Sequence, residues 1–141
     1  MTEAAGTGIF DVAALAAALP DSAGTLLVDT YLTDREAASA RVFRVYRPTP
    51  PHYHATCDEY LYCLSGRGTF WMGDPASVAP FGPGQLLFFA KGIVHAMPEI
   101  ESGAPVTFLS IDTPRRAPTD IIFVNSEDGT PATFMARNAE G

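Results

Sequence analysis

The three histidines of this chain fall in two short segments, and their spacing favours a site built on β-strands. His52 and His54 form a His-x-His pair, and His95 lies on a later hydrophobic segment. Side chains two residues apart on a strand point to the same face, so both imidazoles of the pair can reach one ion. A carboxylate from the neighbouring sequence would complete a site of three nitrogen ligands and one oxygen ligand. Such a site suits a mid-row divalent metal and leaves room for water or substrate.

Two acidic residues follow the pair, and the residues alone leave open which of them would be the fourth ligand. Strict strand alternation from His54 would place Asp58 on the same face, whereas Glu59 is one residue out of step. A turn or bulge after His54 would bring Glu59 into register. The proline-rich approach at 47–51 and the insert at 55–57 are compatible with such a break. Asp58 therefore stays as the alternative ligand at this point.

Glycines at matching offsets give this region a resemblance to the cupin superfamily. The stretch from His52 to Gly66 reads His-x-His-x4-Glu-x6-Gly and is similar to the first motif of the family. The stretch from Gly84 to His95 resembles the second motif, with Ala90 in place of the usual proline before the second glycine. Both motifs include glycines as well as candidate metal ligands, so the resemblance covers the turns around the site as well as the ligands.

This resemblance implies a fold and a ligand set. The fold is all-β: the cupin double-stranded β-helix, or jelly-roll barrel, as found in small single-domain bacterial cupins. The implied ligands of one divalent transition metal are His52, His54, Glu59 and His95, which favours Glu59 over Asp58. The metal would be Fe, Mn, Ni, Zn, Co or Cu, because the ligand set does not select among them. Cupins are often homodimers, so a homodimer is expected.

The rest of the chain fits one small all-β domain. A length of 141 residues is typical of a single domain, and twelve glycines and twelve prolines indicate frequent turns. Asp11 and Pro20 are typical of the start and end of a short helix. We therefore expect an N-terminal helical extension (1–24), a cupin barrel (25–125) and a C-terminal tail (126–141). Strand-like segments lie at 25–32, 40–46, 59–64, 69–72, 85–89, 106–111 and 121–124.

Charge and hydropathy narrow the partners. A formal net charge of −7 argues against nucleic acid and anionic membranes as partners, since both attract basic surfaces. We find no membrane-spanning stretch and no signal peptide, and expect a cytoplasmic protein. Reduced thiols are the simpler interpretation of Cys57 and Cys63, with a ligand role for Cys57 as a weaker alternative. The pair Arg115–Arg116 could bind an anion, but solvated surface charge is the default interpretation.

Strand alternation also predicts the character of the cavity. If Glu59 faces inward, Leu61 and Cys63 face inward as well, and Tyr60 and Tyr62 face outward. The cavity would then be mostly apolar apart from the metal ligands. Such a pocket fits a small, partly apolar or aromatic organic molecule as the ligand.

The first functional hypothesis is a metal-dependent oxygenase, such as a dioxygenase, acting on a small organic molecule. The alternatives are a non-catalytic module that senses a small ligand, and an oxygen-independent, metal-dependent isomerase or lyase. Cupin-type lyases that cleave dimethylsulfoniopropionate carry a tyrosine where this chain has Leu61, which weakens a lyase interpretation. The sequence singles out no catalytic residue. Candidates for a general base, by proximity in sequence only, are Asp58, Tyr60, Tyr62, Lys91 and Glu99.

Overall fold

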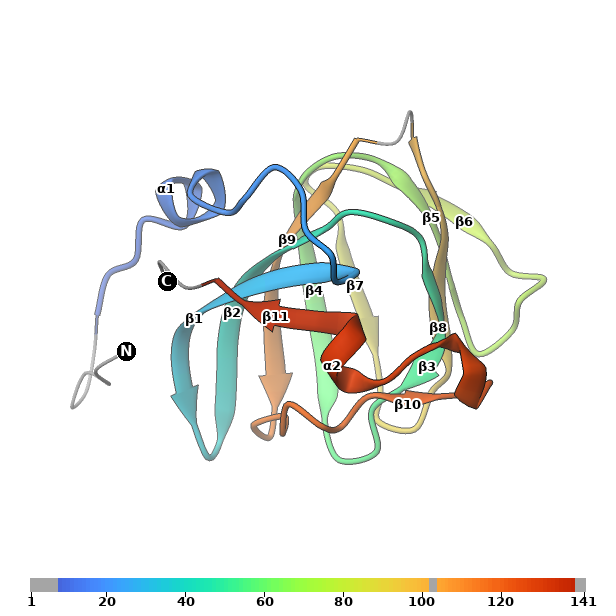
Figure 1. The fold of residues 1–141 in the computed structure, drawn as a ribbon. Coiled ribbons are helices and arrows are strands. Elements are labelled where there is room, and N and C mark those ends of the chain that lie inside the picture. Colours follow the sequence, from blue (N-terminus) through green and yellow to red (C-terminus); the bar gives the residue numbers. More distant parts are fainter. Residues whose placement is uncertain (1–7, 102–103, 139–141) are drawn as a thin grey trace.

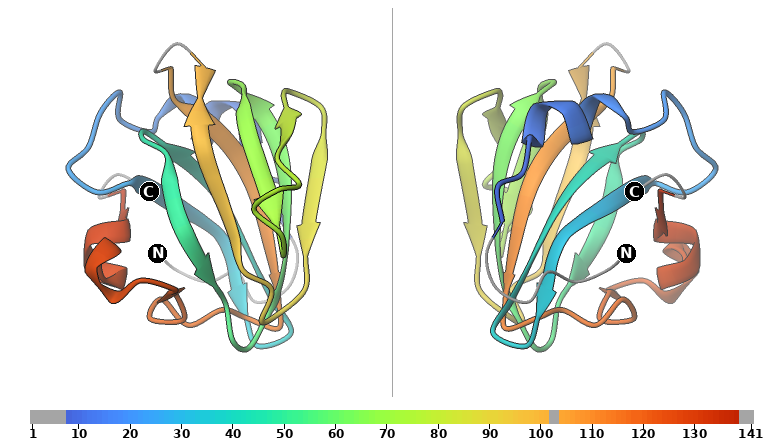
Figure 2. Two further views of the ribbon diagram at one scale, coloured as in Figure 1. Left: turned by 90° about the vertical axis from the view of Figure 1, so that its right-hand side faces the viewer. Right: turned by 90° about the vertical axis from the view of Figure 1, so that its left-hand side faces the viewer.

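The computed structural model describes residues 8–101 and 104–138, and within them the chain folds into two facing β-sheets with a short N-terminal helix (Figure 1, Figure 2). The predicted all-β double-stranded β-helix is thereby confirmed. The first sheet has the order β11-β1-β2-β9-β4-β7, and the second has the order β10-β3-β8-β5-β6. The first comprises β1 (Leu27–Arg35), β2 (Ala38–Val45), β4 (Asp58–Ser65), β7 (Leu86–Phe89), β9 (Val106–Thr113) and β11 (Met135–Arg137). The second comprises β3 (Thr49–Tyr53), β5 (Gly68–Met72), β6 (Ala79–Phe81), β8 (His95–Ile100) and β10 (Ile122–Phe123).

The N-terminal helix α1 (Val12–Ala17) lies outside the barrel, against β2. The carboxylate of Asp11 accepts a hydrogen bond from the backbone amide of Ala14, as the predicted cap requires. The helix ends before Leu19, whose buried side chain packs with Val28 and Val42. The guanidinium of Arg44 donates to backbone oxygens at the helix end, which fixes α1 to the sheet.

Strand β4 shows the alternation that the sequence predicts. Glu59, Leu61 and Cys63 are buried, whereas Tyr60 and Tyr62 are 38% and 42% exposed. The buried faces of the two sheets together form the main hydrophobic core of the described residues. Its members include Phe43, Val45, Leu61, Phe70, Phe81, Phe89, Met97, Val106 and Phe108.

The outer face of β4 and β7 carries an apolar patch. Its exposed side chains are Tyr60, Tyr62, Leu86 and Phe88, and the rings of Tyr60 and Phe88 lie 4.7 Å apart between centroids. β7 is an edge strand of its sheet. Apolar patches of this kind often mark contact sites. The expected homodimer nevertheless stays a prediction.

The segment after β10 returns to the barrel. It passes through the 3-10 helix η2 (Ser126–Asp128) and helix α2 (Pro131–Phe134), and then β11 pairs in parallel with β1 (Figure 1, red). Thr130 caps α2, and Pro131 occupies its first turn, where a missing amide hydrogen does no harm. Residues of the expected C-terminal tail thus add a strand to the first sheet. Among the described helices, none is long and apolar enough to cross a lipid bilayer.

Candidate metal centre

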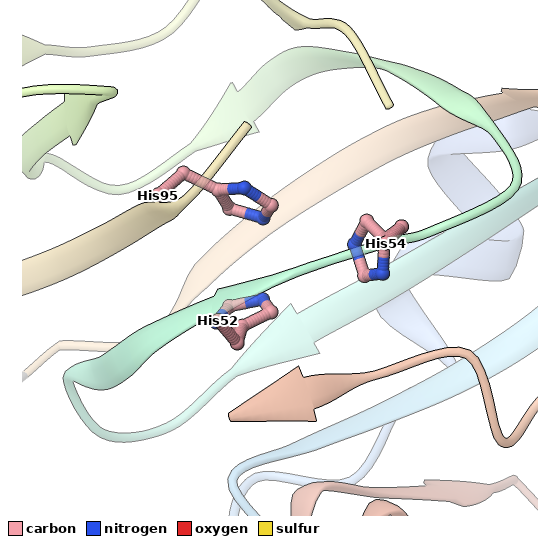
Figure 3. A group of neighbouring side chains, drawn as sticks. All are labelled: His52, His54 and His95. Atoms are coloured by element: carbon pink, nitrogen blue, oxygen red, sulfur yellow. The ribbon is translucent and has the colours of Figure 1, made fainter. Parts of the chain in front are cut away.

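The three histidines converge between the two sheets (Figure 3). His52 lies on β3 and is the direct cross-strand partner of His95, the first residue of β8. His54 follows β3 immediately. All three side chains are buried, and each offers a ligand atom within 4.8 Å of the others. The predicted trio of nitrogen ligands therefore exists as a compact group that could hold one metal ion.

Glu59 faces this group, and Asp58 does not. One carboxylate oxygen of Glu59, Oε1, lies 3.1 Å from Nε2 of His54. The carboxylate of Asp58 instead accepts a hydrogen bond from the backbone amide of Lys91 at 2.9 Å. The break in the strand that this register requires lies at 54–57, outside β3 and β4. Glu59 is thus in position to ligate, and its role as a ligand stays a prediction.

Asp120 holds the break in place, and sequence reasoning missed it. Its carboxylate accepts hydrogen bonds from the amides of Ala55 and Thr56 and from the Thr56 hydroxyl. These bonds hold its pKa below the usual range, although burial alone would raise it. Its backbone oxygen also contacts Nδ1 of His54. Nothing local in the sequence connects residue 120 with residues 54–56, so only the fold reveals the link.

The hydrogen bonds of the three imidazoles define which nitrogen is free. Nδ1 of His52 lies 2.7 Å from the Pro50 oxygen, and Nδ1 of His95 lies 3.0 Å from the Ile93 oxygen. Nδ1 of His54 makes the same kind of contact, at 2.7 Å, with a backbone oxygen. A carbonyl can only accept, so each Nδ1 carries the proton and each Nε2 keeps its lone pair. This is the tautomer that binds a metal through Nε2.

The contact between His54 and Glu59 shows that the site fits a cation. With Nδ1 protonated, Nε2 of His54 is an acceptor unless it carries a second proton, and Oε1 of the Glu59 carboxylate is an acceptor. Two buried acceptors 3.1 Å apart need a positive charge between them, either a proton or a metal ion. Imidazole nitrogens and a carboxylate oxygen are the donor set of first-row divalent metals.

Burial keeps His52 and His95 neutral. Desolvation, reinforced by the neighbouring imidazole of His54, lowers the pKa of His52 to about 4. Burial likewise lowers the pKa of His95 well below its usual value. For Glu59, burial acts to raise the pKa. In the metal-free protein a proton on Nε2 of His54, donated to the carboxylate, and the guanidinium of Arg41 outweigh burial and hold the pKa well below the usual range. A neutral imidazole and an ionised carboxylate are the forms that bind a metal.

A buried cluster of charged side chains holds Glu59 in position. Arg41 on β2 pairs with Asp29 and with Oε2 of Glu59, both at 3.1 Å, and with Asp112 at 3.5 Å. The hydroxyl of Ser110 donates to the same Glu59 oxygen at 2.6 Å. Glu59 is therefore held by one oxygen while the other faces His54. Alternation along β2 could have indicated that Arg41 shares the inner face with Phe43 and Val45, but its partners lie on other strands.

The cavity around the histidines is small and mostly apolar. The space open to the centres of water molecules is about 40 Å³, enough for roughly three waters. Phe70, Phe89, Met97 and Phe134 form part of its wall, and the rings of Phe89 and His95 stack with centroids 3.7 Å apart. The expected apolar cavity is confirmed, and part of its wall comes from α2.

The five candidates for a general base do not line this cavity. Tyr60 and Tyr62 are exposed on the outer face, and Asp58 binds a backbone amide. Glu99 contacts Thr69 at the surface. On β4, Asp58, Tyr60 and Tyr62 alternate with Glu59 and Leu61, so their side chains lie on the opposite face of the strand.

The two cysteines remain free thiols, as predicted. Burial raises the pKa of Cys57 to about 12, and the carboxylate of Asp112 adds to this effect. Cys57 is not part of the histidine group. Its place outside this group disfavours the alternative of a Cys57 ligand.

The two adjacent arginines differ completely in environment. The side chain of Arg115 is 53% exposed and pairs with Asp34 at 2.9 Å, as the default interpretation of surface charge predicts. The side chain of Arg116 is only 2% exposed and lines the cavity beside the histidines. For Arg116 the expectation of a solvated charge was wrong, because residues 114–121 turn back towards the cavity.

Comparison with known proteins agrees with this architecture. The family model described as "Cupin domain" matches residues 44–112, which include both histidine segments. No curated protein is similar enough in sequence to match the chain.

Solved structures share the fold at low sequence identity. The TT1209 protein of Thermus thermophilus is 22% identical with a TM-score of 0.63, over 76% of this chain and 97% of that one. A provisionally assigned mannose-6-phosphate isomerase of Ralstonia eutropha JMP134 is 20% identical with a TM-score of 0.63, over 70% and 94%. A Klebsiella pneumoniae protein with a double-stranded β-helix domain is 18% identical with a TM-score of 0.61, over 78% and 92%. At these identities the likeness establishes the fold alone. The family match shows a cupin domain at residues 44–112, and the solved bacterial structures show that the chain has the small cupin fold.

Proposed function

We propose that this cupin is a metal-dependent oxygenase that acts on a small organic molecule. One divalent transition metal would be held by Nε2 of His52, His54 and His95, with Glu59 as the fourth ligand. The observation that carries the proposal is the group of three buried imidazoles, whose ligand atoms lie within 4.8 Å of one another and whose Nδ1 atoms contact backbone oxygens, which leaves Nε2 to bind a metal. The facing acceptors of His54 and Glu59 support it further.

The chain's own residues would prepare the site for such chemistry. A bound iron or copper ion supplies oxygen chemistry, whereas nickel, manganese, zinc or cobalt supplies Lewis acidity. Backbone oxygens orient the imidazoles, and Arg41 with Ser110 fixes the Glu59 carboxylate. Phe70, Phe89 and Phe134 line the cavity and would limit the entry of bulk water.

Replacement of a histidine should remove the metal without unfolding the barrel. His52→Ala and His95→Ala each delete one of three nitrogen ligands, so we expect the bound metal to fall at least about tenfold. The measurement is elemental analysis of protein purified without chelators or an affinity tag. Circular dichroism serves as the folding control, and Arg115→Gln serves as a matched surface variant that keeps its metal. Unchanged metal content in both histidine variants would show that the site is assigned wrongly.

Oxygen uptake separates the proposed oxygenase from its alternatives. Protein reconstituted anaerobically with Fe(II) is mixed with catechols, diketones and thiols, and oxygen consumption is followed. Consumption that depends on both substrate and metal is the expected result. Turnover without oxygen would instead support an isomerase or lyase, and a thermal shift without any turnover would support a sensor.

A further inference from the structure

Arg116 is a buried cation with unused hydrogen-bonding capacity. Its Nε lies 3.5 Å from Oδ2 of Asp112, and its Nη2 lies 3.8 Å from the sulfur of Met135. Among the residues that the structure describes, none accepts a hydrogen bond from Nε or Nη1. The side chain is 2% exposed and lines the cavity that holds the histidines. A buried guanidinium normally has its donors satisfied, so this arrangement calls for a partner.

Arg41, the other buried arginine of this cavity, uses both of its terminal nitrogens within the protein. Its Nη1 donates to Asp29, and its Nη2 donates to Glu59 and Ser110. Arg41 therefore holds the protein's own carboxylates and has little capacity left for a ligand. Arg116 differs at its terminal nitrogens: Nη1 has no acceptor among the described residues, and Nη2 has the sulfur of Met135, whereas Nε of each arginine lies 3.5 Å from Oδ2 of Asp112.

The charges around the cavity favour an anion once a metal is bound. A divalent ion with Arg41 and Arg116 brings four positive charges, against three negative charges from Asp29, Glu59 and Asp112. Two further charges lie near this group: the guanidinium of Arg137, which pairs with Asp29, and the carboxylate of Asp120. The positive charge of Arg137 and the negative charge of Asp120 cancel each other. One uncompensated positive charge in a buried site is unfavourable unless an anion neutralises it.

We propose that Arg116 binds the carboxylate group of a small anionic substrate in the cavity, beside the metal centre. This inference rests on the proposed metal-dependent function and specifies its substrate class. A carboxylate matches the planar fork of a guanidinium, which can donate two parallel hydrogen bonds to it. The cavity has room for roughly three waters, which limits the substrate to a few heavy atoms unless the wall moves. The substrate is thus a short-chain carboxylate, and its remaining atoms lie against the apolar wall.

Glycolate and its uncharged analogue glycolamide test this proposal by calorimetry. Both are titrated into wild-type protein, with and without metal, and into Arg116→Gln, Arg116→Lys and Arg115→Gln. Wild-type protein should bind glycolate more tightly than glycolamide. Arg116→Gln should weaken glycolate binding at least about thirtyfold and abolish the preference, because it deletes a buried charge partner. Arg116→Lys should give an intermediate affinity, and Arg115→Gln should behave as wild type.

The outcomes separate this proposal from the proposed function. Equal glycolate binding by wild-type protein and Arg116→Gln, or equal wild-type affinity for glycolate and glycolamide, would overturn the role of Arg116. Tighter binding of inorganic phosphate than of glycolate would overturn the substrate class. If Arg116→Gln does not fold, the ratio of glycolate to glycolamide affinity in Arg116→Lys decides the question. Metal content is measured in each sample. A wild-type protein that holds no metal would contradict the proposed function. If that metal-free protein binds glycolate and Arg116→Gln does not, the carboxylate site at Arg116 is still supported.

Discussion

Replacement of Arg41 by methionine should lower the free energy of unfolding by about 3–5 kcal/mol. Arg41 is the shared partner of three carboxylates, those of Asp29, Glu59 and Asp112, and all of them are buried. Methionine fills a similar volume but leaves these carboxylates without their central counter-charge. Removing one member of a buried ion pair is strongly destabilising because the remaining charge stays in a poorly solvated place.

Arg115→Gln is the matched control for this experiment. It also removes one arginine and one ion pair, but the side chain of Arg115 is 53% exposed and that of its partner Asp34 is 37% exposed. Exposed pairs contribute about 0–1 kcal/mol, so the free energy of unfolding should change little. Urea denaturation of both metal-free variants gives the comparison. An Arg41→Met variant as stable as Arg115→Gln would mean that the buried cluster does not hold the carboxylates as described.

Acid should destabilise the metal-free protein well above the pH at which its carboxylates protonate. The pKa of His52 falls from 6.5 to about 4 on folding. Between pH 6.5 and pH 4 the unfolded chain therefore binds a proton at this residue and the folded protein does not. Stability is fully present above pH 6.5 and is lost as the pH falls towards 4, by about 3 kcal/mol for this one residue. The lowered pKa of His95 acts in the same direction.

Comparison with His52→Gln isolates this effect. The variant keeps a polar side chain of similar size but cannot titrate, so its free energy of unfolding should depend less steeply on pH across the same window. Urea denaturation at several pH values measures both slopes in metal-free protein. Parallel curves for the two proteins would show that His52 is not held neutral by burial.

The sequence was most informative where function depends on local spacing. The His-x-His pair could be placed on one strand face because alternation determines it. Alternation alone favoured Asp58 as the acidic partner, and the resemblance to the cupin motif, with its glycines at matching offsets, indicated Glu59 instead. The short N-terminal helix was also predictable, since Asp11 is a local capping signal. Such features can be predicted without knowing which strands are neighbours in the sheets.

The charge cluster and the cavity wall were not predictable in this way. Arg41 meets Asp29 through the pairing of β1 with β2, and meets Asp112 through the pairing of β2 with β9. Arg116 follows a stretch of chain that looks like a surface loop, and only the fold shows that it enters the cavity. Their burial is a property of strand order, which a linear pattern of residues does not encode.

The parallel pairing of β11 with β1 has a consequence for access to the buried imidazoles. Only three residue pairs join these strands, and β11 is at the edge of its sheet, while Phe134 and Met135 next to it line the cavity. Short peripheral strands open locally at a lower free energy than the sheet interior. Amide hydrogens of β11 should therefore exchange with deuterium earlier than those of β4 and β9. The breathing of this edge, rather than any motion of the whole barrel, would set how fast small molecules come and go.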